Sequence, residues 1–197
     1  MREMVTAASL GLKEKIDPEA ESLIARIKER ARNLYLTHQL LCAEAVVMAL
    51  NNGLNGGLSD SQVVAMTAPF CVALGESGCL CGALSGAVMA SGLFLGNDSA
   101  YRNRRDMRNG ARQLHDAFKS ANGATCCSVL IRKVKHDRKA HFQQCSDLTA
   151  EAAELAARLI LHKRPALITQ ADNGFLARCD SRFNGTLSRL FRLISSQ

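Results

Sequence analysis

The sequence contains no Trp and only three Pro, and aromatic residues make up just 5% of the chain. Its hydrophobic content still reaches 47%, so Ala, Leu, Val, Ile and Met supply most of the apolar side chains. Such side chains suit closely packed helices. No long stretch alternates apolar and polar residues as a half-buried strand would. We therefore predict an all-α fold, with one helical domain as the simplest arrangement for 197 residues.

The sequence also lacks a run of apolar residues long enough to span a membrane. The longest run, Ala83–Leu95, is too short and is diluted by Gly and Ser. Residues Met1–Leu12 lack the apolar core and cleavage site of a signal peptide. We therefore expect a cytoplasmic protein whose thiols stay reduced. In that compartment, clustered cysteines indicate metal or redox chemistry more often than structural disulfides.

No Ser/His/Asp constellation, phosphate-binding loop or pair of catalytic carboxylates stands out, so we do not predict hydrolysis or phosphoryl transfer. The net charge is +7, yet the basic segments are not interleaved with aromatic residues as a base-stacking surface is. We favour a basic solvated surface and do not expect nucleic acid as a partner. The contrasting class is a nucleic-acid-binding module in which the cysteines act as a redox sensor. The basic segments are Arg102–Arg112, Arg132–Lys139 and the C-terminal tail.

Eight cysteines are many for a chain of this length. Two of them lie in the motif Gly78-Cys79-Leu80-Cys81-Gly82-Ala83-Leu84-Ser85-Gly86, which leads into a predicted helix over 82–95. Four thiols lie at or near the start of a predicted helix, and if those helix ends converge they form an electropositive pocket. Such a pocket favours thiolates and an anionic thiolate–metal cluster. The four are Cys42, Cys81, Cys127 and Cys145.

Outside the cysteine motif, capping residues and apolar periodicity indicate where the helices lie. Asp17-Pro18-Glu19 has the composition of a helix start, and Ser59 with Gln62 has the spacing of a capping box. Apolar periodicity and Gly or Pro breaks then divide the chain. The predicted helices begin after Asp17 and cover 40–50, 59–68, 82–95, 99–121, 125–134 and 142–163, with a short helical piece over 70–74.

Small residues recur every four positions in the helix predicted over 82–95, at Gly82, Gly86 and Ala90. This spacing leaves a groove into which another backbone or a cofactor can approach closely. Residues 1–165 are predicted to form the helical domain and 166–197 an appendage that contains the amphipathic basic stretch Thr186–Ile194. That stretch has the pattern of a helix that packs on the body, on a second subunit or on a membrane surface, and we favour protein. The groove and the appendage together suggest a homodimer.

The segment Cys81-Gly82-Ala83-Leu84-Ser85-Gly86 fits the pattern C-G-A-x-x-G, and the chain resembles the C_GCAxxG_C_C family of redox-active proteins over Arg30–Lys163. That family has one cysteine before this signature and two after it. Cys42 resembles the first, Cys127, three residues before a Leu, resembles the third, and Cys145 the fourth. Relatives include split-Soret cytochromes, which carry c-type haem and an iron–sulfur centre. No C-x-x-C-H motif is present here, so we expect no c-type haem. The resemblance leaves an iron–sulfur centre open.

We therefore interpret the chain as a redox or electron-transfer protein that works with a redox partner protein. The first hypothesis is a 2Fe–2S or 4Fe–4S cluster on Cys42, Cys81, Cys127 and Cys145, with Cys79 and Cys126 as substitutes for their neighbours. Zinc is a variant, although paired C-x-x-C knuckles are absent. The second hypothesis is a metal-free thiol–disulfide protein that uses Cys79 with Cys81, or Cys126 with Cys127. An oxidoreductase activity stays open, because no catalytic group is identified.

The remaining cysteines and the histidines carry weaker signals. Cys71 and Cys179 are interpreted as small hydrophobes, the usual role of a buried cysteine. His38, His136 and His141 lie near family cysteines in the sequence, and we interpret each as a loop or surface residue.

Overall fold

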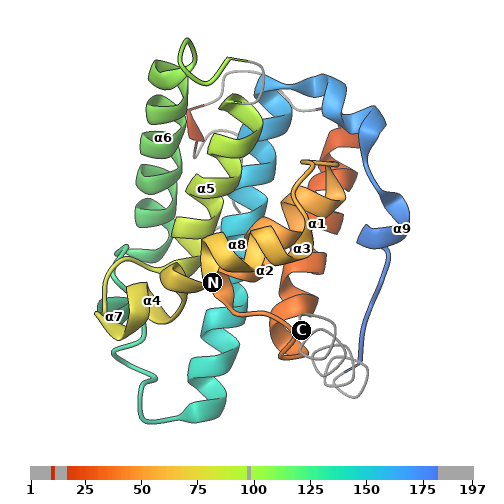
Figure 1. Cartoon of the computed structure of the whole chain (residues 1–197). Helices are drawn as coiled ribbons and strands as arrows, with labels where there is room; N and C mark the ends of the chain where they lie inside the picture. Colours follow the sequence, from red (N-terminus) through yellow and green to blue (C-terminus); the bar gives the residue numbers. More distant parts are fainter. Residues whose placement is uncertain (1–9, 12–16, 97–98, 182–197) are drawn as a thin grey trace.

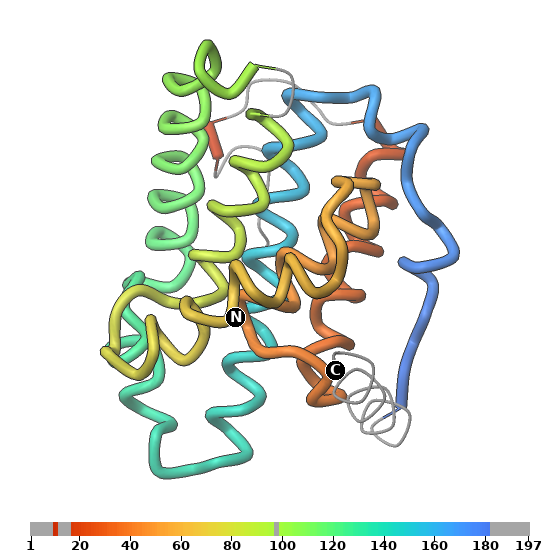
Figure 2. The backbone as a smooth tube through the Cα atoms, viewed as in Figure 1, coloured from red at the N-terminus to blue at the C-terminus, as the bar shows by residue number. Residues whose placement is uncertain are grey.

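The computed structural model describes residues 10–11, 17–96 and 99–181. Within these ranges the chain forms helices and no strand, so the predicted all-α class is confirmed (Figure 1). The smooth backbone trace in Figure 2 shows the helices side by side as a bundle. No helix in the described part of the chain is long and apolar enough to cross a membrane.

Helix α8 (Arg138–Lys163) is the centre of the bundle, and it packs against α1, α2, α5 and α6. Its residues from Leu148 to Leu161 are all buried, because neighbours cover it on every side. The Ala-rich sequence of this stretch keeps those neighbours close. Over this stretch α8 is therefore buried around its whole circumference.

The neighbours of α8 begin and end where the sequence provides caps. In α1 (Pro18–Leu36), the Asp17 carboxylate accepts a hydrogen bond from the Glu19 amide, as predicted. In α3 (Asp60–Thr67), Ser59 and Gln62 form the predicted capping box. The other long helices are α2 (Cys42–Gly53), α5 (Gly82–Gly96) and α6 (Arg104–Asn122).

Several predicted bounds are wrong. Helix α6 starts at Arg104 rather than at residue 99, because turns occupy residues 99–103. The helix predicted over 125–134 is only α7 (Cys127–Leu130), and turns follow it. After η2 (Ala68–Phe70), the short α4 (Cys71–Glu76) does not continue as a right-handed helix: its residues Val72–Gly75 have φ between 52° and 60°.

The first part of the predicted appendage packs along α1 and α2. Short helices η3 (Pro165–Gln170) and α9 (Asn173–Leu176) follow α8. The Asp180 carboxylate lies 2.8 Å from the Arg30 guanidinium of α1, and the Asp172 amide donates to the Gly53 carbonyl of α2. The predicted amphipathic stretch Thr186–Ile194 lies outside the described residues, and the domain boundary stays a prediction.

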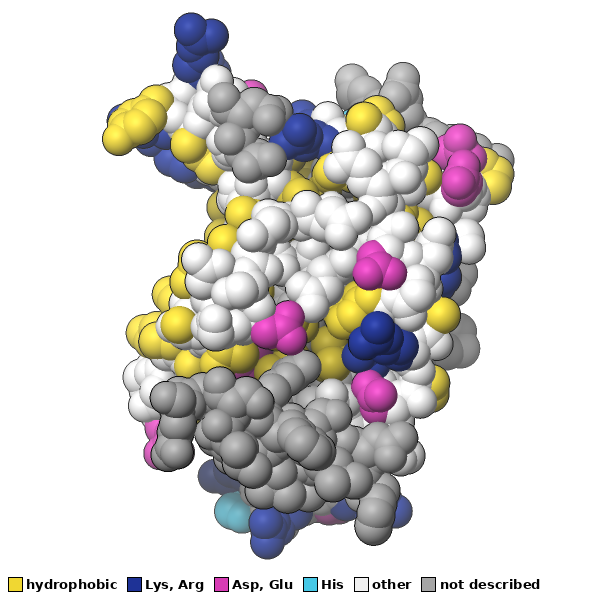
Figure 3. All heavy atoms as spheres, turned by 45° about the vertical axis from the view of Figure 1, so that its right-hand side comes forward, with side chains coloured by type: hydrophobic (Ala, Val, Ile, Leu, Met, Phe, Trp, Pro, Cys, Tyr) yellow, Lys and Arg dark blue, Asp and Glu magenta, His cyan; other side chains and the backbone are white. Residues whose placement is uncertain are grey.

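Figure 3 shows the face of the molecule that carries α9. Lys and Arg side chains gather mainly at its upper and lower ends, while acidic and apolar side chains lie between them. On this face the charge of +7 therefore does not form one continuous basic surface.

Candidate functional site

The four predicted site cysteines come from four separate elements that meet at one end of the bundle, near α4 and α7 in Figure 1. Cys42 is the first residue of α2, Cys127 is the first residue of α7, and Cys81 directly precedes α5. Together with Cys145 of α8, they line a cavity of about 320 Å³. The structure thus brings together thiols that are separated by up to about a hundred residues in the sequence.

Cys145 does not lie in the first turn of its helix, and that prediction is wrong. Helix α8 begins at Arg138, because the Asp137 carboxylate accepts hydrogen bonds from the amides of Lys139 and Ala140 and caps it there. Part of the segment between the helices predicted over 125–134 and 142–163 is therefore helical, and Cys145 lies about two turns inside α8. Only three of the four thiols lie at helix starts.

The small-residue groove of α5 brings the Cys42 thiol close to the start of α5. A Cβ atom at Gly82 would lie 2.5 Å from the Cys42 Sγ, and one at Gly86 would lie 2.8 Å from the Ala43 carbonyl oxygen. Only glycine allows α5 and α2 to approach this closely. The predicted close contact is confirmed, and its partner is another helix of the same chain.

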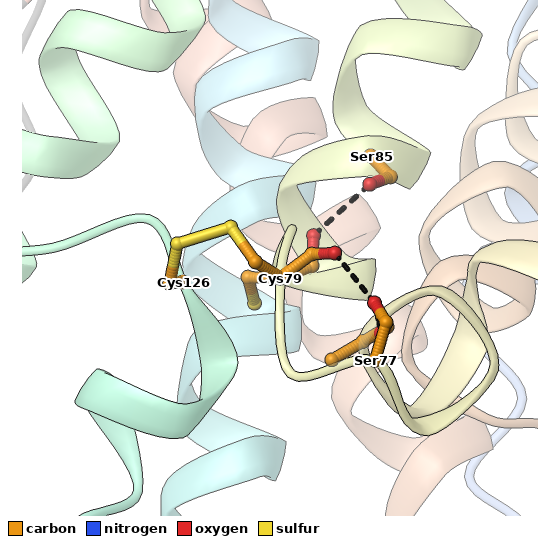
Figure 4. The surroundings of a disulfide bond; sticks show 6 residues. Ser77, Cys79, Ser85 and Cys126 are labelled. Atoms are coloured by element: carbon orange, nitrogen blue, oxygen red, sulfur yellow. Dashed lines mark hydrogen bonds between the residues drawn. A yellow bond between two sulfur atoms is a disulfide. The ribbon is translucent and has the colours of Figure 1, made fainter.

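The turn before α5 is joined to the start of α7. The Cys81 amide donates to the Thr125 carbonyl at 2.8 Å, and the Ser128 amide donates to the Gly78 carbonyl at 3.0 Å. A disulfide between Cys79 and Cys126 connects the same two segments (Figure 4). These bonds hold the neighbouring thiols Cys81 and Cys127 at the cavity.

The disulfide differs from both pairs expected for a metal-free redox protein. Neither Cys79 with Cys81 nor Cys126 with Cys127 is bonded, because the folded chain places Cys79 opposite Cys126, with Cα atoms 4.4 Å apart. Cys79 and Cys126 do not line the cavity among the described residues, whereas Cys81 and Cys127 do. The structure therefore distinguishes the members of each neighbouring pair.

Burial raises the pKa of three cavity thiols, Cys81, Cys127 and Cys145. The pKa of Cys81 rises to about 12 and that of Cys145 to about 11, and the pKa of Cys127 also rises, with desolvation as the largest cause. Amides of Ala83 and Leu84 at the start of α5 favour the Cys81 thiolate, but they do not offset its burial. For Cys81 and Cys127 the expectation that a helix start favours the thiolate is wrong, because desolvation outweighs the helix end.

The described wall of the cavity contains no permanently charged cation beside these thiols. Among the described residues that line it, none is Lys or Arg, and the ionisable neighbours besides the cysteines are Tyr35, Glu76 and His141. Most of the remaining wall is apolar, so the protonated thiol is favoured in the ligand-free site. The apolar and small lining residues are Leu41, Val72, Ala73, Gly78, Gly82, Ala83, Ile131 and Leu148, with Ser128 beside them.

Sequence reasoning missed Tyr35, which lies at the end of α1 and lines the cavity. Its hydroxyl donates a hydrogen bond to the Cys145 sulfur, which favours the thiolate of Cys145. Burial raises the pKa of Tyr35, so the hydroxyl keeps its proton for that bond. The Phe142 ring stacks on Tyr35 with centroids 5.1 Å apart. The available signal was that the chain contains only two Tyr residues.

The other residues near the family cysteines divide into two groups. His141 lines the cavity, whereas the His38 ring stacks on Phe142 with centroids 4.6 Å apart and His136 is exposed. Cys179 is exposed, so its interpretation as a buried hydrophobe is wrong. Cys71 is buried, as interpreted, but it lies beside Cys42.

One wall of the cavity contains an unusual backbone segment. Val72, Ala73 and Leu74 all have φ between 52° and 59°, in the left-handed region that non-glycine residues rarely adopt. Each such residue costs about 1–3 kcal/mol. The surrounding packing must hold this turn in place, and it positions Val72 and Ala73 at the cavity.

The cavity offers thiols, the ligand type that both iron–sulfur clusters and zinc take. In the described ranges, no three His, Cys, Asp or Glu side chains form a group that could hold one ion. The thiols of a cluster bind different irons and are spaced more widely than the ligands of one ion. Four thiols around a cavity of about 320 Å³ have the number and the chemistry of such a ligand set.

The sequence comparison gives the same pattern of cysteines. A family profile described as "Putative redox-active protein (C_GCAxxG_C_C)" matches residues 40–159, more than half of the chain. The chain belongs to this family. The matched range contains all four cavity thiols, and the predicted resemblance is thereby confirmed. No curated protein and no solved structure matches the chain significantly.

Membership in the C_GCAxxG_C_C family indicates a redox-active protein, without specifying a cofactor or a reaction. The residues able to undergo redox chemistry are the cavity thiols and the Cys79–Cys126 disulfide. All of them lie at the same end of the bundle, so redox chemistry is concentrated there.

Proposed function

We propose that the protein transfers electrons through an iron–sulfur cluster held by Cys42, Cys81, Cys127 and Cys145. The observation that carries this proposal is that these thiols, each from a different element, line one cavity. When bound, a 2Fe–2S or 4Fe–4S cluster supplies a one-electron redox centre. Zinc on the same thiols is the alternative occupant.

The chain's own groups prepare the cavity for thiolate ligands. The Tyr35 hydroxyl stabilises negative charge on Cys145, and amides of Ala83 and Leu84 do the same for Cys81. Hydrogen bonds to ligand sulfurs raise the reduction potential of such centres. The apolar wall limits water, which strengthens these interactions. The buried thiols release their protons when they bind metal.

A redox partner protein is proposed to dock at the mouth of this cavity. Leu41, Val72 and Val129 are large apolar residues that are about half exposed, and Leu41 and Val72 also line the cavity. The segment 132–140 connects two lining residues, Ile131 and His141, so its charges lie at the rim. It has five basic residues and one acidic residue, which favours an acidic partner.

The argument for a homodimer is weaker than the argument for a redox partner. The small-residue face of α5 contacts α2 of the same chain, so it does not serve a second subunit. The dimer stays a prediction. We also propose a reducing compartment, the cytoplasm, because the six free thiols of the described structure persist most readily there.

The test is metal analysis on protein purified without oxygen. Iron, acid-labile sulfide and zinc are measured per chain, together with the visible absorption spectrum. We expect iron and sulfide in equal amounts and a brown colour, both lost in Cys81→Ser and Cys145→Ser. Cys179→Ser is the matched control, since Cys179 is exposed and does not line the cavity. A colourless protein without metal, both as purified and after reconstitution with iron and sulfide, would overturn the proposal.

The second candidate is a metal-free thiol–disulfide protein, and the Cys79–Cys126 disulfide is the observation that favours it. Each bonded cysteine is within two residues of a free cavity thiol. A defined two-electron reduction of this disulfide in a glutathione titration, in a protein that takes up no metal, would support this candidate. Iron and sulfide that disappear in Cys81→Ser would favour the cluster.

A further inference from the structure

Cys71 is not one of the signature cysteines, but it lies beside one of them. A Cβ atom built on Gly82 would lie 2.5 Å from the Cys42 Sγ and 3.4 Å from the Cys71 Cα, so both cysteines approach the same point. The Cys42 thiol is also the largest cause of the raised pKa of Cys71. The start of α2 and the start of α4 thus place two free thiols side by side.

The two thiols differ in access. Cys42 is partly exposed and lines the cavity, so a small reagent that enters the cavity meets its sulfur. Cys71 is only 3% exposed, and its thiol also donates to the Thr67 carbonyl at 3.6 Å. An outer thiol beside an inner one is the arrangement of an attacking and a resolving cysteine.

We propose that Cys42 and Cys71 form a reversible dithiol–disulfide couple, with a low-molecular-weight disulfide such as oxidised glutathione as the oxidant. The Cys42 sulfur attacks one sulfur of the reagent, whose S–S bond breaks and whose first half leaves as a thiol. The Cys71 sulfur then attacks the Cys42 sulfur and releases the second half as a thiol. The two cysteines lose two electrons and two protons, and the oxidant gains both.

This couple shares Cys42 with the proposed cluster site, and its regulatory consequence rests on the proposed function. A sulfur in a disulfide cannot also be a thiolate ligand. Oxidation therefore removes one of the four ligands, and reduction restores it. Loading of the site becomes dependent on the thiol–disulfide balance around the protein.

The test uses the full chain, freed of metal, reduced and then equilibrated with rising ratios of oxidised to reduced glutathione. Free thiols are alkylated, and the protein is cut with a Glu-specific protease. Cleavage after Glu29, Glu44, Glu76 and Glu151 leaves Cys42 on peptide 30–44 and Cys71 on peptide 45–76, while the other cavity cysteines stay on peptide 77–151. Trypsin cannot separate them, because residues 33–101 contain no Lys or Arg.

We expect a covalent pair of peptides 30–44 and 45–76 to replace their alkylated forms as the ratio rises. In Cys71→Ser the pair disappears, and peptide 30–44 carries glutathione on Cys42 instead. Cys179→Ser should behave as the wild type. The proposal is overturned if wild-type Cys42 remains alkylated, keeps glutathione, or joins peptide 77–151.

A folding defect in Cys71→Ser would be visible as lost helical circular dichroism, and Cys42→Ser then serves as the second variant. In Cys42→Ser, Cys71 should stay alkylatable only after unfolding, because it is buried. Glutathione on Cys71 in the folded variant would contradict the proposed order of attack.

The outcome separates this couple from the proposed function. If the peptide pair forms but the protein never binds iron, the couple stands and the cluster fails. If iron binds but the pair never forms, the cluster stands and the couple fails. If both occur, oxidation before reconstitution should abolish iron uptake, and dithiothreitol should restore it.

Discussion

Helix α8 passes through two buried polar sites that are built in opposite ways. Near its C-terminal end, Arg158 is 8% exposed and donates to Glu21 at 2.6 Å and to Glu154 at 2.9 Å. Lys28 adds a second cation to Glu154 at 2.7 Å. Near its N-terminal end, Cys145 faces the cavity with the other three thiols, and no Lys or Arg is among the described lining residues.

The two sites differ in how the chain balances buried charge. At Arg158, α1 and α8 supply every charge with an opposite charge, so the site is complete without an outside group. At the second site, burial raises the pKa of Cys145, and the Tyr35 hydroxyl, a neutral donor, lowers it only in part. We call the site at Arg158 the complete site and the site at Cys145 the incomplete site, because no Lys or Arg is among the described residues that line the latter.

The largest expected effect comes from breaking the complete site. Arg158→Met should lower the free energy of unfolding by about 3–5 kcal/mol, because it breaks the pairs with Glu21 and Glu154 and leaves Lys28 as the counter-charge of the buried Glu154. Urea unfolding followed by circular dichroism measures this change. Adding Glu154→Gln should recover part of the loss. A loss below about 1 kcal/mol would contradict this prediction, because it would match the contribution of a solvent-exposed ion pair.

The next effect concerns the covalent tie beside the incomplete site. Cys126→Ser should lower the free energy of unfolding by about 2–4 kcal/mol relative to the oxidised wild type, because the Cys79–Cys126 disulfide closes a loop with a sequence separation of 47. Reducing the wild type should produce the same change, and reduction of Cys126→Ser should produce none. Equal stabilities of the oxidised wild type and the variant would mean that the bond does not form in solution.

A smaller effect tests the close contact that places Cys42. Gly82→Ala should cost about 1–3 kcal/mol in unfolding free energy, since the new Cβ would lie 2.5 Å from the Cys42 Sγ and 2.7 Å from the Phe70 carbonyl oxygen. It should also reduce iron uptake by displacing Cys42. Gly92→Ala is the matched control in the same helix, because its Cβ would meet nothing within 4 Å. The control should gain up to about 1 kcal/mol, and a matching gain in Gly82→Ala would contradict the packing.

The smallest effect is the pH dependence of the incomplete site. Burial raises the pKa of Cys145 from 9.0 to about 11, so the folded protein keeps a proton that the unfolded chain releases above pH 9. The free energy of unfolding should therefore fall between about pH 9 and 11, by on the order of 1 kcal/mol. Urea unfolding from pH 7 to 11 measures the slope. Cys145→Ala should show a shallower one, and an identical slope would exclude Cys145 as its source.

Helix starts that depend on a capping residue nearby in the sequence were predictable. The Asp17 cap and the Ser59 capping box follow from residues within one turn of each other. Two of the helix bounds that were predicted wrongly also have local causes. Asp137 caps α8 earlier than expected, and the turn at Val72–Gly75 has a handedness that its side chains do not favour.

The candidate site was predictable in its membership more than in its chemistry. The signature and the order of the cysteines identify Cys42, Cys81, Cys127 and Cys145, and the fold places all four at one cavity. For Cys81 and Cys127 the direction of the pKa shift was predicted wrongly. Helix starts can be read from a sequence, but desolvation depends on what the rest of the chain places around each sulfur.

By itself, the sequence determined the all-α class, the family and the close approach at Gly82 and Gly86, because composition, signature and spacing are properties of neighbouring residues. Only the tertiary structure decided that Cys79 bonds to Cys126, that Cys71 meets Cys42 and that Tyr35 reaches Cys145. Each of these contacts joins segments far apart in the chain. Their distances depend on how whole helices pack, and no local pattern records that packing.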